Sequence, residues 1–160
     1  MLRALLSLPI VLLVAACFPF PTEPPIDVLP TPPPDAPVDA PLASIRVTGG
    51  IAFRDTLWTV ATDGTVIETD LRAQRIQTKR LLDGPAGAAR LAEQLRASGV
   101  TAVASGRFGP QQHCCDRQEY DLTIVLDGKL YRFVTIDGET APAPVLEARR
   151  LVLAAARSAG

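Results

Sequence analysis

The only dense group of reactive side chains in this sequence is His113-Cys114-Cys115-Asp116, and His113 is the single histidine of the chain. Thiols and imidazoles serve nucleophilic catalysis, redox chemistry and zinc binding. Zinc ligands, however, are commonly separated by two or more residues, because consecutive side chains cannot easily all point at one ion. A cysteine–histidine pair also needs a fold that holds both groups at hydrogen-bond distance beside an orienting third group. We therefore expect no metal site and no catalytic residue here.

The N-terminus indicates the compartment in which these groups work. Residues 1–16 have the three-part layout of a secretory signal, with Arg3, an apolar run over residues 4–14, and small residues before Cys17. The string Val14-Ala15-Ala16-Cys17 closely resembles the lipobox of bacterial lipoproteins. The resemblance implies cleavage before Cys17, acyl chains such as palmitate on that residue, and attachment of the mature protein to a membrane of the cell envelope.

Two alternatives remain for this N-terminal segment. A transmembrane helix needs about 20 apolar residues, whereas the apolar run is shorter and contains Pro9. An ordinary secreted protein with Cys17 removed or unmodified is the other alternative. Phe18 stands where an aspartate retains well-studied Gram-negative lipoproteins at the inner membrane, so the sequence favours the outer membrane if the bacterium has one.

Residues 17–42 are expected to be the lipidated cysteine followed by a proline-rich tether. Residues 18–42 hold ten of the chain's 15 prolines, and proline fixes φ and cannot donate a backbone hydrogen bond. Such a segment extends by about 3.1 Å per residue as a spacer. A ligand for a groove-type domain is the alternative, but no basic residue flanks the prolines.

Once Cys17 is acylated, Cys114 and Cys115 are the two remaining thiols, and in an oxidising envelope they are expected to pair. Adjacent cysteines form a strained ring, since their Cα atoms lie about 3.8 Å apart. Strained, exposed disulfides are the more easily reduced ones. A static disulfide that shapes its loop, a redox-sensitive switch, and unpaired or intermolecular thiols all remain as alternatives. A permanently oxidised pair would count against the redox role.

Residues 43–160 are long enough for one domain with its own core. Asp63-Gly64 and Asp127-Gly128 each lie between two β-rich runs, which predicts a hairpin over residues 56–70 and a second over residues 120–136. We expect further strands at residues 44–48, 75–81 and 101–104, and an irregular loop over residues 105–119.

Apolar residues at helical spacing predict two helices. The first begins at Asp83 or Gly84, with Pro85 in its first turn, and ends at Gly99; the second covers residues 145–158. The expected fold is therefore α+β, with a mainly antiparallel sheet of two hairpins covered by two helices on one face.

Charge and motifs exclude several function classes. The formal net charge is −1, and the arginines are scattered, so nucleic-acid binding is not expected. The sequence contains no G-x-S-x-G, P-loop, H-E-x-x-H or G-x-G-x-x-G motif. We therefore expect a protein that is not an enzyme and that needs no cofactor.

Parts of the domain resemble emfourin, a family of small bacterial protein inhibitors of thermolysin-like metallopeptidases. The resemblance is carried by residues 45–52, the helix with Leu91 and Leu95, residues 120–128 and the Pro-flanked final helix. It implies a domain that plugs a protease cleft through a loop. The lipid anchor, the tether and the vicinal cysteines are departures from that family, and the resemblance supplies no inhibitory residue.

The sequence thus predicts a lipid-anchored envelope protein with a small binding domain that blocks an extracytoplasmic metallopeptidase. A structural or assembly lipoprotein, or a thiol redox factor using Cys114 and Cys115, are the alternatives. The expected contact surface is the loop over residues 105–119, stiffened by the disulfide, with the candidate contact residues Arg107, Phe108, Gln111, Gln112, His113 and Asp116.

Overall fold

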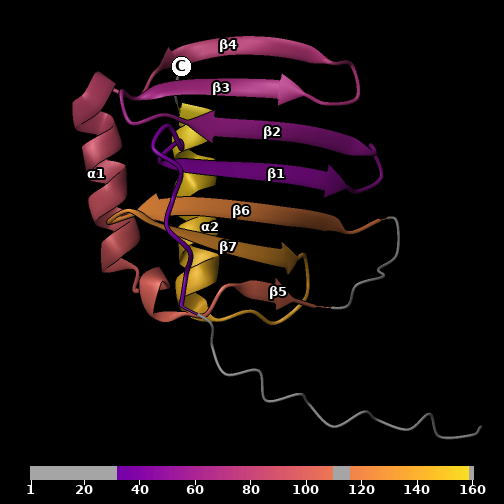
Figure 1. Ribbon diagram of the computed structural model, residues 1–160. Coiled ribbons are helices and arrows are strands. Elements are labelled where there is room, and N and C mark those ends of the chain that lie inside the picture. The colour runs from indigo at the N-terminus through magenta and orange to yellow at the C-terminus, as the bar shows by residue number, and fades with distance from the viewer. Residues whose placement is uncertain (1–31, 110–115, 159–160) are drawn as a thin grey trace, which may run out of the picture.

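The computed structural model describes residues 32–109 and 116–158. Seven strands form one sheet in the order β4-β3-β2-β1-β6-β7-β5, and two helices complete the fold (Figure 1). The elements, in chain order, are β1 (Ala43–Gly49), β2 (Arg54–Val60), β3 (Thr65–Asp70), β4 (Arg75–Leu81), α1 (Gly84–Ala97), the 3₁₀ helix η1 (Val100–Ala102), β5 (Gly106–Phe108), β6 (Gln118–Leu126), β7 (Lys129–Ile136) and α2 (Ala143–Ser158).

The expected α+β class is confirmed, with a mostly antiparallel sheet and two helices. The β2–β3 and β6–β7 pairs lie where the sequence predicts hairpins, but the sheet extends further. Strand β1 pairs with β2 on one side and with β6 on the other, so it joins the first four strands to the last three. Asp127 and Gly128 both adopt positive φ, as a tight hairpin turn requires.

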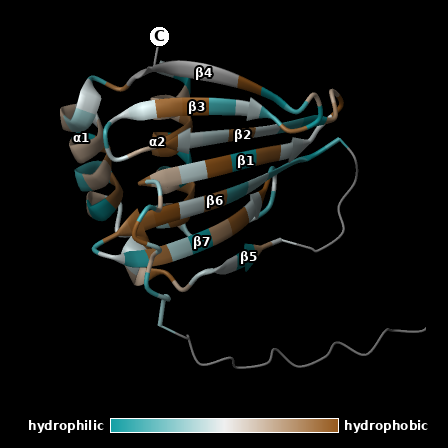
Figure 2. Cartoon of the chain, turned by 45° about the horizontal axis from the view of Figure 1, so that its top comes forward, coloured by the Kyte–Doolittle hydropathy of each residue, from teal (hydrophilic) through white to brown (hydrophobic). Residues whose placement is uncertain are grey.

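Alternate residues of the central strands point into one core. On β1, Ala43, Ile45 and Val47 are buried, while Arg46 between them is exposed. The same alternation runs along β6, and the strands are banded with apolar and polar residues (Figure 2). Buried residues of both helices belong to the same core cluster, and α1 and α2 contact each other. Period-two burial on the strands therefore follows directly from the sequence pattern.

Helix α1 starts and stops at the residues that the sequence indicates. Asp83 caps its N-terminus in a left-handed conformation, with proline in the first turn. Gly99, at φ 77°, follows the last turn and redirects the chain. The buried residues of α1 include Leu91 and Leu95, and Val152 and Ala148 are among those of α2. The predicted apolar stripes thus pack into the core.

Two local expectations about residues 101–119 are wrong. The chain after Gly99 forms the 3₁₀ helix η1 instead of a strand, because Ala102 N–H bonds back to the Gly99 carbonyl and Val100 is fully buried. Residues 106–108, expected to be irregular, form β5, which pairs in parallel with β7. Parallel pairing with a distant strand leaves no local period-two or turn signal.

Residues 32–42, which the sequence places in the tether, lie against the domain. Ala36 N–H donates to the Gly128 carbonyl at 2.8 Å, and Leu130 N–H donates to the Pro34 carbonyl at 2.9 Å. The Lys129 ammonium bonds Asp35 at 2.6 Å. We call this segment the strap. Its last residue, Leu42, is buried in the core.

No helix in the described part of the chain is both long and apolar enough to cross a membrane.

Close packing at Gly87 gives a test of the fold. A Cβ at this position would lie 1.4 Å from the Leu82 carbonyl oxygen, so we expect Gly87→Ala to lower the free energy of unfolding by about 2 to 3 kcal/mol. Gly106→Ala is the matched control, because no atom lies within 4 Å of its added Cβ. Urea unfolding of both variants measures the difference, and equal midpoints would contradict this packing.

Candidate functional site

Several turns gather at one end of the sheet. Residues 50–53 join β1 to β2, residues 71–74 join β3 to β4, and residues 116–117 lead into β6. Residues 137–139 follow the end of β7 at the same end, which lies on the right in Figure 1. We call this group of turns the loop end. Because each turn is attached to a paired strand, the sheet fixes their relative positions.

The turn over residues 50–53 exposes two large apolar side chains. Ile51 is 85% exposed and Phe53 is 60% exposed. Single exposed apolar residues are ordinary on protein surfaces. Two within three residues, on a turn whose backbone is fixed, form a compact apolar tip of the kind that anchors protein–protein contacts.

One hydrogen bond within this turn and two with neighbouring segments fix it. Gly50 N–H donates to the Arg117 carbonyl at 3.0 Å, and Phe53 N–H donates to the Gly50 carbonyl at 2.9 Å. The Arg72 guanidinium donates to the Phe53 carbonyl at 2.7 Å. Phe53 itself has φ 46°, a conformation that a non-glycine residue keeps only where its surroundings enforce it. The apolar tip is therefore held in one backbone shape.

Gly49 permits the close approach of the neighbouring strand. Its φ is 85°, and a Cβ there would lie 2.5 Å from the Arg117 carbonyl oxygen. A larger residue would push the turn away from residues 116–117 and break the Gly50–Arg117 hydrogen bond. The Gly49-Gly50 pair thus couples the apolar tip to the start of β6.

A polar network under the loop end ties it to α2. The Tyr120 hydroxyl lies 2.8 Å from Gln118 Oε1 and 3.1 Å from Asp137 Oδ2. The Arg149 guanidinium lies 4.4 Å from the centre of the Tyr120 ring and donates to Thr135 Oγ1 at 3.1 Å. Burial raises the pKa of the Tyr120 phenol, and the Asp137 carboxylate acts in the same direction. The phenol therefore stays protonated and serves as a structural donor.

The candidate contact residues from the sequence occupy different places. Arg107 lies on β5 and donates two hydrogen bonds to Glu119, at 2.9 and 2.8 Å. Phe108 is half-buried and packs against the core. Asp116 is exposed at the loop end. The other predicted site residues, Cys17, Gln111, Gln112, His113, Cys114 and Cys115, lie outside the described residues.

Sequence reasoning missed Ile51 and Phe53. A signal was present, since both follow Gly49-Gly50 in a turn position where polar residues are usual. The alternating pattern of the strand before the turn indicates core residues, and it does not indicate that the apolar residues of the turn are exposed. Only the paired positions of β1, β2 and β6 show that these side chains project from the loop end.

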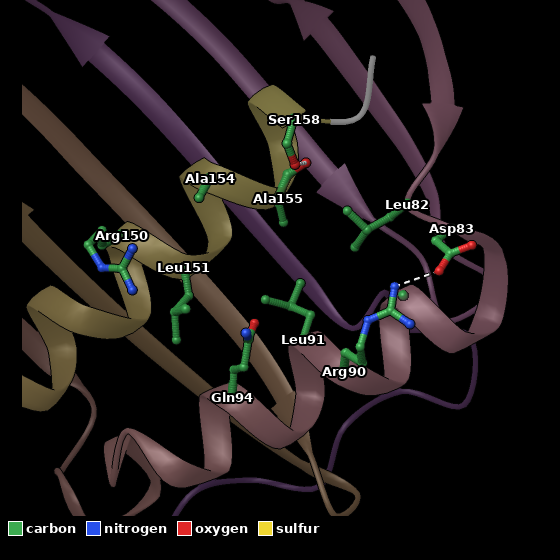
Figure 3. Close-up of a pocket in the computed structure, with 11 residues that line it drawn as sticks. Leu82, Asp83, Arg90, Leu91, Gln94, Arg150, Leu151, Ala154, Ala155 and Ser158 are labelled. Carbon is green, nitrogen blue, oxygen red and sulfur yellow. Dashed lines mark hydrogen bonds and ion pairs between the residues drawn. The ribbon is translucent and has the colours of Figure 1, made fainter.

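A hollow lies between helices α1 and α2. It has a volume of about 500 Å³, and Figure 3 shows Leu91 and Gln94 of α1 facing Leu151 of α2 across it. Arg90 at its edge is paired with Asp83 at 2.6 Å, and Arg150 is paired with Glu147 on its own helix, also at 2.6 Å. These arginines are neutralised locally, so the hollow presents a weakly charged surface and no reactive group.

Metal ligands do not gather in the described residues. Within residues 32–109 and 116–158, no three side chains of the His, Cys, Asp and Glu types lie close enough together to hold an ion.

Comparison with known proteins gives no family for this chain. No family model matches the sequence, and no curated protein matches it either.

The Arg46–Asp55 pair beside the loop end generates a pH-dependence test. Two hydrogen bonds of 2.8 Å join the two side chains, and the bonds from Arg46 hold the pKa of Asp55 below its ordinary value. The folded protein thus gains stability from Asp55 above about pH 4, and loses it as the pH falls through the lowered pKa. Asp55→Asn should cost about 0.5 to 1 kcal/mol at pH 7.

As the pH falls below the ordinary carboxyl pKa of about 4 and through the lowered pKa of Asp55, the difference in stability between Asp55→Asn and the unsubstituted chain should shrink, because the native carboxyl becomes protonated. Urea unfolding across this pH range measures the change. Asp39→Asn, at an exposed position of the strap, is the control and should change little at any of these pH values. A difference that stays constant with pH would show that the ion pair does not contribute.

Proposed function

We propose that this chain is a lipid-anchored cell-envelope protein whose domain binds and inhibits an extracytoplasmic metallopeptidase of the thermolysin-like class. The observation that carries the proposal is the apolar tip, Ile51 and Phe53, on a turn fixed by hydrogen bonds. The likeness of residues 45–52 to emfourin supports it, since Ile51 of the tip lies within that stretch and Phe53 follows directly after it.

A fixed, protruding turn suits an inhibitor that enters a cleft. Binding costs less conformational entropy when the contact loop already has its bound shape. Two exposed apolar side chains then supply the area that a cleft can bury, at about 25 cal/mol per Å². The Gln118 side chain, which bonds the Tyr120 hydroxyl, lies beside Gly50 at the start of the turn. The tip can therefore bear on a partner without rearranging.

Arg117 and Gln118, at the end of the expected contact segment, lie beside the turn that carries the tip. Gly50 bonds the Arg117 carbonyl, and the pairing of β1 with β6 places Gly49 opposite Gln118. In this proposal the tip and Asp116 contribute to one contact surface.

An assembly or structural lipoprotein is the second candidate. It is favoured by β4, which forms one edge of the sheet and carries Ile76, 67% exposed. A partner strand added to this edge would satisfy the open backbone groups of β4. The thiol redox alternative depends on Cys114 and Cys115, which lie outside the described residues, so no described residue supports it.

The inhibitor proposal is tested with a chain that starts after Cys17. It is immobilised, a metallopeptidase is recovered from an envelope extract of the same bacterium and identified by mass spectrometry, and the inhibition of that peptidase is titrated. We expect the double variant Ile51→Ser, Phe53→Ser to weaken inhibition at least about 100-fold, because two buried apolar anchors would be lost.

Ile76→Ser is the matched control, since it removes an equally exposed apolar residue from the β4 edge. It should leave inhibition unchanged. Recovery of structural envelope proteins instead of a peptidase, in an Ile76-dependent manner, would favour the assembly role. Inhibition that survives loss of both tip residues would refute the proposed contact surface.

The proposed anchor has its own test. With Cys17→Ser we expect no incorporation of labelled palmitate and release of the protein from the membrane fraction, because acyl chains supply the membrane affinity at about 0.8 kcal/mol per buried methylene. Cys114→Ser is the control and should still be labelled. Labelling of the Cys17→Ser chain would disprove attachment at this residue.

A further inference from the structure

We infer that a second copy of this chain docks on the sheet face opposite the core, through a row of alternating charges. The row consists of Asp55, Arg46, Asp121 and Arg132, one residue each from β2, β1, β6 and β7. We call it the charge row. It lies on four neighbouring strands of the sheet, and Arg46, Asp121 and Arg132 each lie between two buried core residues along their strands.

The strand register places these four residues on one stepped line across the four strands. Arg46 lies directly opposite Asp121. Asp55 lies opposite Thr48, two residues along β1 from Arg46 toward the loop end. Arg132 lies opposite Thr123, which pairs with Ser44, two residues along β1 in the other direction. The line is therefore symmetric in position about the midpoint between Arg46 and Asp121.

The signs of the charges are opposite at symmetric positions. Asp55 and Arg132 are the outer pair, and Arg46 and Asp121 are the inner pair. Homodimers are most often built on a two-fold axis, which brings the same patch of both copies together. An axis that runs obliquely across the middle of the row sets Asp55 of one copy against Arg132 of the other, at two places in the dimer, while Arg46 and Asp121 of both copies lie near the axis. Each outer arginine then meets an aspartate.

Bonds within each copy prepare the row for this contact. Arg46 donates two hydrogen bonds to Asp55, both of 2.8 Å, and Arg132 donates two to Asp121, of 2.9 and 2.6 Å. The side chains are thus already ordered, so less entropy is lost on docking. Arg46 is still 47% exposed and Arg132 62% exposed, so both guanidinium groups can reach a second carboxylate.

The rest of this face carries one further ion pair, between Arg107 and Glu119, and the face is large enough for a weak dimer. Seven strands spaced about 4.8 Å apart, each about six residues long, give about 600 Å² per copy and about 1,200 Å² in total. That is the lower limit for a specific interface. Two sheets can pack face to face at about 10 Å. The neutral residues on this face are Leu57, Thr59, Ile67, Thr69, Thr123 and Val134, all half-buried.

Docking at the charge row is independent of the proposed inhibition. The apolar tip lies in the turn beyond the ends of β1 and β2, whereas the row lies on the strands themselves. Ile51→Ser and Phe53→Ser should therefore leave self-association intact. A failure of the inhibitor proposal and a failure of this one can be told apart.

The test is sedimentation equilibrium of the chain that starts after Cys17, over a concentration series. We expect a monomer–dimer equilibrium that weakens with added salt, because charges form part of the contact. The proposed dimer has two outer contacts, each between position 55 of one copy and position 132 of the other. Arg132→Glu sets two carboxylates against each other at both contacts, and Asp55→Arg sets two guanidinium groups against each other at both. Each variant alone should dimerise at least about 10-fold more weakly.

An equimolar mixture of Arg132→Glu and Asp55→Arg should restore dimers, because both outer contacts then pair opposite charges. Arg90→Glu, which reverses an exposed arginine on α1, is the matched control and should dimerise like the unsubstituted chain. Circular dichroism verifies the fold, and Arg132→Gln with Asp55→Asn replace any reversal variant that unfolds; each should then weaken dimerisation. A chain that stays monomeric throughout, or charge reversals that the mixture does not rescue, would overturn the inference.

Discussion

The pairing of β1 on both of its edges is the constraint on which the rest of this structure depends. Strand β1 pairs with β2 on one side and with β6 on the other. It therefore joins β2, β3 and β4 to the β6–β7 pair in one sheet. Its inward residues, Ala43, Ile45 and Val47, are almost completely buried. A one-residue slip would expose them and bury Arg46. Register, core and the position of every turn at the loop end are thus fixed together. Long-range pairing of this kind also makes folding depend on contacts between distant segments.

The sequence predicts the parts of the fold whose signals are local. Asp127-Gly128 needs only its own positive φ angles to turn a chain, and α1 carries its own proline, apolar stripe and terminal glycine. Strand β5 carries no such signal, because its three residues become a strand only when β7 lies beside them. The strap is similar, since a proline-rich segment has the same composition whether it is solvated or bonded to Gly128 and Leu130. The apolar tip escaped prediction for the same reason, since exposure of Ile51 and Phe53 is a property of the whole sheet.

The candidate site combines a small contact element with a large support. Two apolar side chains project outward, while hydrogen bonds to Arg72 and Arg117 hold the backbone of their turn. This arrangement suits recognition, which is the role that we propose for it. It also separates tasks within the fold, because helices and core stabilise the domain at a distance from the surface that a partner would meet. Changes at the tip can therefore alter recognition with little effect on stability.

The strap gives the domain a particular response to mechanical load. Its hydrogen bonds and the Lys129–Asp35 ion pair lie at the β6–β7 turn, at the opposite end of the sheet from the loop end. Tension applied from the N-terminal side meets these bonds one after another, as in unzipping, before it reaches the buried Leu42 and β1. Peeling would release about 35 Å of extended chain while the sheet stays folded. The strap can thus extend under tension before the force reaches the sheet and unfolds the domain.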